Sequence, residues 1–317
     1  MLYIPKVGCV MTLAQLVSIV FISSSSMANT IMNKYLVSRA HVQSRFFVLA
    51  VQTTVILAVL LGMNVFVGED LQTSFEFLKK WLVLSFSLII MIYSGLQANV
   101  LPISLFTIFK NGSIPIIVIY DYLHKGYVIE ELTGASFVFL VASSLLGSVS
   151  DVSDTDASDV SSGKAQTSVT KQKARVVGMV WMAINCISSA CYAIRINILM
   201  KASGVSSVAA AIYINSLALP FLLILAAAEA FTFKIPTKHM PAICFSGLTS
   251  CAVSVSTTWA ASIFTTTTLA MVMALNKTPM AMSGIVFGLE RLGSPWKWVS
   301  VGLGLISATC YAVSKRH

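Results

Sequence analysis

Two lysines are the residues best placed to do chemistry in this 317-residue sequence, because each lies in an otherwise apolar stretch. Lys110 lies in FTIFKNGSIP and Lys277 in MVMALNKTPM, and in both strings an asparagine adjoins the lysine and a proline follows. A charge near the centre of a membrane helix costs about 2.5–3.5 kcal/mol. Facing a water-filled cavity that receives an anion lowers this cost, so the pair predicts a site for a phosphate or diphosphate group. The alternative is that both side chains snorkel or cap helix ends.

The remaining reactive side chains do not form a catalytic group. The four histidines, at positions 41, 124, 239 and 317, fall near the ends of the apolar stretches, and no stretch contains a pair of carboxylates. An intramembrane enzyme that modifies lipids is therefore a remote alternative. The six cysteines lie in apolar stretches without a CxxC pair, so we expect no metal, no cofactor and no disulfide.

The composition excludes a soluble enzyme, a secreted disulfide module and a disordered chain. Only 10% of the residues are charged and 56% are hydrophobic, with a mean hydropathy of +0.84, whereas soluble domains carry about 25% charged residues. The net charge is +9, but the basic residues are scattered rather than gathered in a stripe. The charge therefore indicates a membrane surface or an anionic substrate, and we expect no nucleic-acid partner.

The apolar stretches predict an all-α integral membrane protein with about ten transmembrane helices. Their expected extents are 8–32, 46–67, 81–99, 103–121, 132–150, 176–199, 208–229, 241–262, 266–288 and 296–314. Residues 151–175 are rich in Ser, Asp and Lys, which predicts a solvated linker loop in the middle of the chain.

The two halves of the chain share landmarks at one spacing. Lys110 and Lys277 are 167 positions apart (277 − 110), and so are Lys34 and Lys201 (201 − 34). This predicts a first five-helix repeat over 1–150, a polar linker over 151–175 and a second repeat over 176–317. Because five spans is an odd number, the two repeats would have opposite orientations, as in many secondary transporters whose site lies at the repeat interface.

Polar residues inside the later spans add candidates for binding. Asn215 lies beside Tyr213 in an apolar stretch, and an amide can recognise both edges of a purine base. Ser254 belongs to a hydroxyl-rich eighth span. Such residues also serve as hydrogen-bond partners between helices, which is the alternative interpretation.

Several strings resemble the Golgi nucleotide-sugar transporters of the drug/metabolite transporter superfamily, and specifically the GDP-mannose transporter group. They are LIIMIYSGLQ at 88–97, SLFTIFKNGSIPI at 104–116, SLALP at 216–220, ALNKTPMAMSGIVF at 274–287 and YAVSK at 311–315. The resemblance covers nearly the whole chain. It implies an antiporter, in a multi-pass Golgi membrane, that imports GDP-mannose in exchange for the nucleoside monophosphate GMP. The partners are then the bilayer and these nucleotides, and small-residue helix faces would also support a homodimer.

The resemblance also assigns roles to residues. The group carries a Gly-Ala-Leu-Asn-Lys signature associated with the nucleotide sugar and a Phe-Tyr-Asn-Asn signature associated with guanine. Here Met273 replaces the glycine, Ile214 replaces one asparagine, and Leu269 stands where the group has a tyrosine. The implied substrate-binding residues are Met273, Ala274, Leu275, Asn276, Lys277, Tyr213, Asn215, Ser254 and, from its buried charge, Lys110.

These departures leave a second reading open. The same fold could carry another GDP-sugar, a UDP-sugar or a sugar phosphate. A membrane scaffold without transport is a third reading, and it gives no reason for lysines at repeat-related positions inside apolar stretches.

Overall fold

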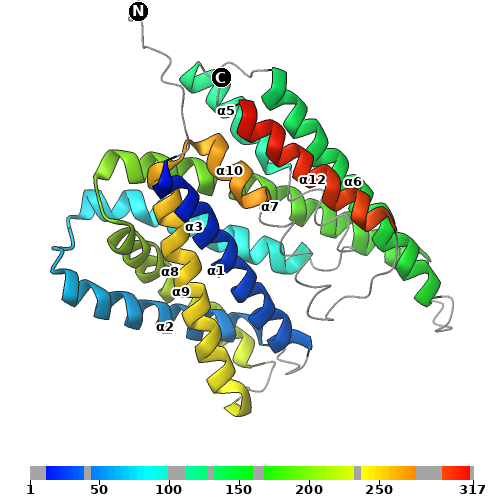
Figure 1. Ribbon diagram of the computed structural model, residues 1–317. Helices are drawn as coiled ribbons and strands as arrows, with labels where there is room; N and C mark the ends of the chain where they lie inside the picture. Colours follow the sequence, from blue (N-terminus) through cyan, green and yellow to red (C-terminus); the bar gives the residue numbers. More distant parts are fainter. Residues whose placement is uncertain are drawn as a thin grey trace, which may run out of the picture.

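The computed structural model describes residues 12–38, 44–98, 112–126, 131–159, 168–231, 237–275 and 295–314. Within these ranges every regular element is a helix (Figure 1). The elements are α1 (Leu13–Ser38), α2 (Arg45–Val67), α3 (Phe75–Gln97), α5 (Ser113–Lys125), α6 (Glu131–Asp159), α7 (Ser168–Ser203), α8 (Ser207–Ala230), η2 (Thr237–His239), α9 (Met240–Ile263), α10 (Thr266–Leu275) and α12 (Pro295–Ser314).

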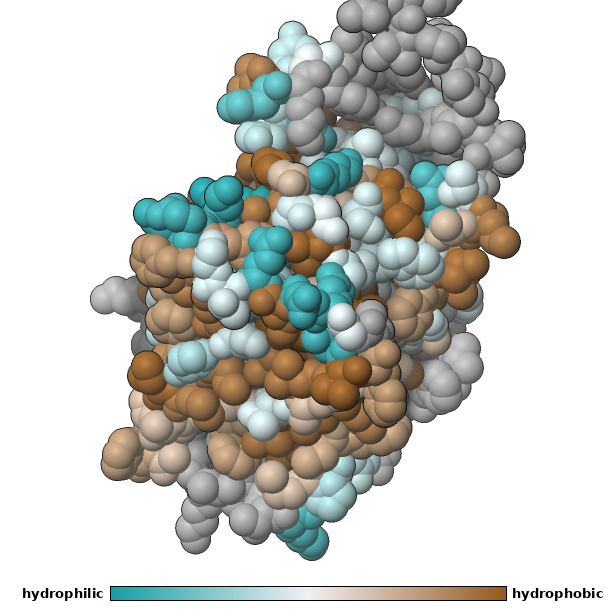
Figure 2. Space-filling model, turned by 90° about the vertical axis from the view of Figure 1, so that its left-hand side faces the viewer, coloured by the Kyte–Doolittle hydropathy of each residue, from teal (hydrophilic) through white to brown (hydrophobic). Residues whose placement is uncertain are grey.

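Five of the described helices are long and apolar enough to cross a membrane. The candidate spanning segments, by length and composition, are Leu13–Asn33, Arg45–Phe66, Val176–Ser203, Ser207–Ala230 and Met240–Ile263. Figure 2 shows a face with a broad apolar region across its lower part, hydrophilic side chains across its upper and middle parts, and a smaller hydrophilic group at its lower edge. The prediction of an all-helical membrane protein is confirmed, whereas the ten-span inverted repeat stays a prediction.

The structure corrects the extent of the central linker. Residues 151–175 were expected to form a loop, but α6 continues to Asp159 and α7 begins at Ser168. Residues 160–167 lie outside the described residues. The segment contains no proline, and its only glycine is Gly163. Extending an existing helix is far easier than nucleating one, so the flanking apolar helices propagate into this polar sequence.

Helices α6 and α12 pack side by side along a seam of hydroxyl groups (Figure 1). Ser143 and Ser300 each donate to the carbonyl of the other at 2.6 Å. Two turns away, Ser307 donates to the carbonyl of Ser136 at 2.7 Å. Small hydroxyl residues allow close approach of membrane helices and also satisfy each other's polar groups. The earlier residue of α6, Ser136, pairs with the later residue of α12, Ser307, so the two helices are antiparallel.

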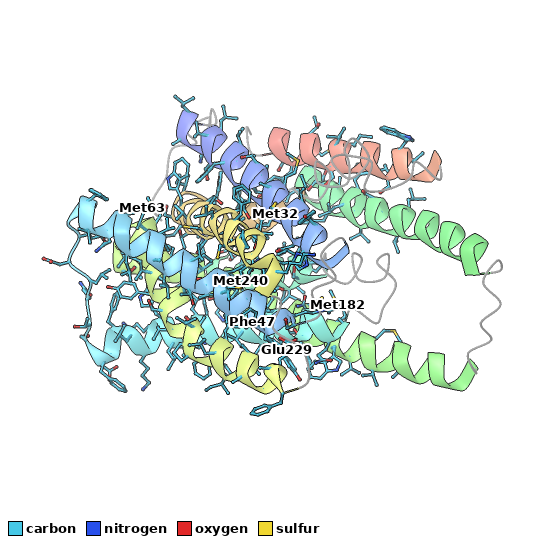
Figure 3. The ribbon with its side chains drawn as sticks, turned by 90° about the horizontal axis from the view of Figure 1, so that it is seen from below. Met32, Phe47, Met63, Met182, Glu229 and Met240 are labelled. Carbon is cyan, nitrogen blue, oxygen red and sulfur yellow. The ribbon has the colours of Figure 1, made fainter. Side chains whose placement is uncertain are left out.

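Helices α2 and α8 form a second antiparallel pair, which is joined at both ends by carboxylates. The α2 N-cap residue, Ser44, makes no capping hydrogen bond. Instead, Glu229 at the end of α8 accepts from the backbone N–H groups of Arg45, Phe46 and Phe47 at 2.7, 2.7 and 3.1 Å. In Figure 3 Glu229 lies beside Phe47. The first turn of α2 is thus capped by a helix from the other half of the chain.

The opposite end of this pair is joined in the same way. Glu69 follows α2 and accepts hydrogen bonds from the hydroxyl and the backbone N–H of Ser206. Ser206 is the N-cap residue of α8, and its side chain accepts from the N–H of Ala209. Each helix therefore contributes a carboxylate to the N-terminus of its neighbour, where the helix dipole favours negative charge.

Helix α9 packs against both α1 and α2. In Figure 3 Met32 and Met240 mark the ends of α1 and α9 that lie near each other. The approach to α2 depends on Gly247, since a Cβ at this position would lie 2.8 Å from the Cβ of Val55. This close packing positions the polar face of α9 toward the interior.

Candidate functional site

The two sides of α9 differ in polarity. Phe245 and Leu248 are 55% and 47% exposed on its outer side. At about 100° per residue, Ser250 and Ser254 project from the opposite side of the helix, toward α1, α2 and α8. Both serines are nevertheless only partly buried. Inward-facing hydroxyl groups that remain accessible are typical of a polar cavity lining, and they mark the candidate site.

Asn215 on α8 belongs to this site. Its amide nitrogen donates to the Ser254 hydroxyl at 3.0 Å and to the Ala211 carbonyl, one turn back, at 2.8 Å. Both amide protons are thus used within the protein. Among the described residues nothing donates to the amide oxygen of Asn215, which leaves an oriented acceptor beside Ser254. The structure therefore brings together two of the residues predicted to bind substrate, Asn215 and Ser254.

Helix α1 brings a second amide to the same side of α9. The Asn29 amide oxygen accepts from the Ser250 hydroxyl at 2.9 Å and lies 3.2 Å from the Thr249 hydroxyl. The side chain is partly buried. Within the described part of the chain, its amide nitrogen has no acceptor. Asn29 therefore presents donors in the region where Asn215 presents an acceptor.

One turn further along α1, a third group of polar side chains is already satisfied. Gln52 on α2 donates to the amide oxygen of Asn33 at 3.1 Å and to the Ser246 hydroxyl at 2.7 Å. Gln52 is 4% exposed and Ser246 is fully buried. Amide and hydroxyl bonds of this kind fix the register of neighbouring membrane helices. This group ties α1, α2 and α9 together at one end of the site.

The described site is therefore composed of neutral donors and acceptors. Such groups can bind sugar hydroxyls or the edge of a nucleobase, but they do not neutralise a phosphate. In the described ranges no group of three or more His, Cys, Asp and Glu side chains could hold a metal ion. Neutralising a bound anion requires basic residues, and one candidate, Lys277, follows helix α10 in the sequence.

Helix α10 is attached to two neighbours through hydroxyl groups. The carboxylate of Asp121 on α5 accepts from Thr267 at 2.6 Å, and the hydroxyls of Thr268 and Tyr311 on α12 are 2.8 Å apart. Asp121 is 3% exposed. Helix α5 begins three residues after Lys110, and α10 ends two residues before position 277. The Asp121–Thr267 bond therefore joins the two helices that adjoin the repeat-related lysines.

Asn197 on α7 fixes the turn between α9 and α10. Its amide nitrogen donates to the carbonyls of Ala261 and Phe264 at 2.9 and 2.7 Å, and its oxygen accepts from Thr266 at 3.2 Å. Asn197 is 2% exposed. One buried side chain thus satisfies carbonyls that the end of α9 leaves without helical partners.

Comparison with the sequences of known proteins identifies the family of this chain. No family model matches the chain. The GDP-mannose transporter of Yarrowia lipolytica is 32% identical over 319 residues, which span 96% of this chain and 95% of that protein. The GDP-mannose transporter of Aspergillus fumigatus is also 32% identical, over 92% of this chain and 78% of its own length. The chain belongs to the GDP-mannose transporter group of nucleotide-sugar transporters.

Two further comparisons concern another relative and a solved structure. The GDP-mannose transporter of Meyerozyma guilliermondii is 29% identical over 95% of this chain and 85% of its own length. One solved structure, described only as a crystal structure of a protein, superposes with a TM-score of 0.69 over 96% of this chain and 98% of that one. It is 13% identical, so it shows that the overall fold has been observed in a crystal and nothing more.

The family signature around Asn215 is divided between two sides of α8. Tyr213 is 6% exposed and packs against the rings of Phe77 and Trp81, with centroid distances of 5.1 and 5.4 Å. Its hydroxyl lies near the backbone of Gln72, in the loop between α2 and α3. Two residues along a helix point in nearly opposite directions. The structure therefore does not bring Tyr213 to Asn215, and its predicted contact with the base stays untested.

Two positions at which this member departs from the family signatures lie in the apolar core. Ile214 is 2% exposed, and its carbonyl accepts from the hydroxyl of Ser85 on α3 at 3.1 Å. Leu269 on α10 is fully buried in the same cluster of side chains. Neither residue offers a polar side chain to a substrate. Both side chains therefore belong to the apolar core of the described helices.

The second signature lies at the end of α10. Met273 is 39% exposed, and α10 ends at Leu275 after Ala274. The three remaining predicted residues, Asn276, Lys277 and Lys110, lie outside the described residues. Their contact with substrate therefore stays a prediction.

Three polar residues of the described site were not identified from the sequence. Asn29 and Gln52 are single amides inside apolar stretches, and Asp121 is a carboxylate that was placed at the end of a span. The signal was available in each case, because an amide or carboxylate in a membrane helix needs a partner. The partners of Gln52, Asn29 and Asp121 on α9 and α10 are, however, 194, 221 and 146 positions away in the chain, and they become known only from the fold.

Proposed function

We propose that this protein is a nucleotide-sugar antiporter that moves GDP-mannose into the Golgi lumen in exchange for GMP. The observation that carries the proposal is the similarity to GDP-mannose transporters, 32% identity over 96% of the chain. The polar interior formed by α1, α8 and α9 supports it, because a soluble nucleotide needs a wet, hydrogen-bonding path through an apolar bilayer. Two inverted five-helix repeats that rock about this interior would provide alternating access.

The proposed contacts divide the substrate into three parts. The amide oxygen of Asn215 accepts from the base, because its nitrogen is already committed to Ser254 and Ala211. Lys277 and Lys110 neutralise the diphosphate from the two repeats. Asn276 bonds hydroxyls of the sugar. In this arrangement the neutral groups select the substrate, and the lysines supply most of the attraction.

Obligatory exchange follows from the cost of the empty site. Lysines in the membrane interior are costly to retain without a counter-anion. A carrier loaded with a nucleotide would cross between its two states faster than an empty one. Net uptake would then be slow, and uptake against internal GMP would be fast.

The proposal is tested by counterflow in proteoliposomes. Vesicles loaded with GMP should take up external radiolabelled GDP-mannose many times faster than empty vesicles. Unlabelled GDP-sugars, UDP-sugars and sugar phosphates are then added as competitors. Uptake that is independent of internal GMP would contradict exchange. Competition by UDP-sugars alone, with no GDP-mannose uptake, would replace the proposed substrate.

The assignment of the lysines is tested with one variant and one control. Lys277→Ala should reduce exchange by at least 100-fold, since an unpaired phosphate charge inside the membrane costs about 3 kcal/mol or more. Lys79→Ala, which removes an exposed lysine at the start of α3, should exchange normally. A folded Lys277→Ala protein with normal exchange would contradict the assignment.

One observation favours a related candidate function. Ile214 and Leu269 are buried apolar residues at two positions where the family signatures carry polar side chains. A site with fewer polar contacts could select another nucleotide sugar. The competition panel distinguishes the two candidates. If the second is right, an unlabelled UDP-sugar or a different GDP-sugar inhibits uptake of radiolabelled GDP-mannose at a lower concentration than unlabelled GDP-mannose does.

A further inference from the structure

Asn29 on α1 bonds to the same helix, α9, as the proposed base-binding residue Asn215, and it is not part of either family signature. Its amide oxygen is held by the Ser250 hydroxyl at 2.9 Å, and Asn215 is held by the Ser254 hydroxyl at 3.0 Å. Ser250 and Ser254 are four residues apart on α9, so the two hydroxyls lie on one face, about one helical turn apart. Two amides from different halves of the chain are therefore bonded to hydroxyl groups about one helical turn apart on one helix.

The two amides use opposite ends in their hydrogen bonds to the protein. Asn215 donates both of its amide protons within the protein, so its oxygen is the group presented to the interior. Asn29 accepts through its oxygen, so its nitrogen is the group presented. The Ala211 carbonyl, which can only accept, fixes the orientation of the Asn215 amide. The site thus offers an acceptor and a donor that are bonded to hydroxyl groups about one helical turn apart on α9.

We infer that Asn29 is a specificity-determining residue that recognises the nucleobase together with Asn215. A keto nucleobase such as guanine or uracil has a carbonyl oxygen next to a ring N–H. The Asn29 nitrogen would donate to that oxygen, and the Asn215 oxygen would accept from the N–H. Adenine and cytosine carry an amino group next to an unprotonated ring nitrogen, which reverses the pattern and leaves both amides unsatisfied. The inference rests on the proposed function, since it assumes that the substrate is a nucleotide.

With Asn29 at the base, the chain retains two amides for base recognition although Ile214 replaces one asparagine of its signature. Ile214 is 2% exposed in the apolar core, so it contributes no amide to the site. Asn29 supplies an amide from α1 instead. A structural role alone is the competing explanation, and Asn33, one turn along the same side of α1, shows what that role looks like. Its oxygen accepts from Gln52, which also donates to buried Ser246.

The test compares Asn29→Ala with Asn33→Ala in proteoliposomes. For each protein, inhibition of exchange is measured with two pairs of competitors, GMP against AMP and UMP against CMP. In the unmodified protein we expect the keto nucleotide of the preferred pair to bind better. Asn29→Ala should reduce that preference by about fivefold to tenfold, which corresponds to loss of one hydrogen bond with an unsatisfied partner. Asn33→Ala should leave the preference within about twofold of the original.

A second variant covers the case in which Asn29→Ala does not fold. Ser250→Ala removes only the hydroxyl that orients the amide, and it should reduce the base preference in the same direction by a smaller factor. An unchanged preference in folded Asn29→Ala, or equal losses in Asn29→Ala and Asn33→Ala, would overturn the inference. If the unmodified protein prefers UMP, the proposal of GDP-mannose fails. Asn29 is still tested in that case, through the ratio of UMP to CMP.

Discussion

The carboxylate of Glu229 should stabilise the α2–α8 pair measurably, because it replaces a cap that α2 lacks. Three backbone N–H groups, those of Arg45, Phe46 and Phe47, donate to it at 2.7, 2.7 and 3.1 Å. Loss of an N-cap costs about 0.5–2 kcal/mol, and loss of a carboxylate at a helix N-terminus costs a further ~0.3–1 kcal/mol. Because Glu229 is partly exposed, solvent screening favours the middle of this range.

We therefore expect Glu229→Ala to lower the free energy of unfolding by about 2 kcal/mol, and Glu229→Gln by about 1 kcal/mol. The amide of glutamine keeps an acceptor but loses the charge. The assay is unfolding in mixed detergent micelles, followed by hydrogen exchange of the backbone amides at 45–47, which should lose protection. Glu76→Gln is the control, since this exposed carboxylate lies in the first turn of α3. A Glu229→Gln protein as stable as the control, with unchanged protection at 45–47, would refute the reasoning.

Three further perturbations test the packing around the site. Glu69→Gln should destabilise α8 by about 1 kcal/mol, seen as faster hydrogen exchange in its first turn and not in α2. Gly247→Ala should lower stability by about 1–3 kcal/mol, because the added Cβ would lie 2.8 Å from Val55; Gly62→Ala, with nothing within 4 Å, should be neutral or stabilising in the same unfolding assay. Asn197→Ala should lower the free energy of unfolding by about 2–3 kcal/mol, since it leaves two buried carbonyls at the end of α9 unsatisfied. It should also reduce nucleotide exchange in proteoliposomes. Normal stability would show that water replaces the amide.

Much of the fold could be predicted from the sequence because a bilayer restricts what an apolar stretch can do. Helices α2, α8 and α9 begin and end within two residues of the extents predicted from polar punctuation. The polar segment 151–175 was predicted less well. Its composition indicates solvent exposure, and an exposed polar segment can be either loop or helix. Hydropathy alone does not distinguish the two.

The candidate site could be predicted only in part. Asn215 was recognised from a signature and Ser254 from the hydroxyl-rich eighth span, and the two side chains do lie together at 3.0 Å. Tyr213 shares that signature but faces the aromatic side chains of α3. Tyr213 and Asn215 are neighbours in the sequence, but two positions along a helix point to nearly opposite sides, so their shared signature does not mean a shared site. Asn29 shows the reverse, since its position beside Ser250 depends on a contact between the first and eighth predicted spans.

The central claim is that the protein exchanges a guanine nucleotide sugar for its monophosphate through a site that includes Lys277. The most direct measurement is uptake of radiolabelled GDP-mannose into proteoliposomes loaded with GMP, compared between the unmodified protein and Lys277→Ala. The account predicts rapid uptake that requires internal GMP in the first case and at least a 100-fold loss in the second. Absence of GDP-mannose uptake by the folded, unmodified protein, or full uptake by Lys277→Ala, would contradict it.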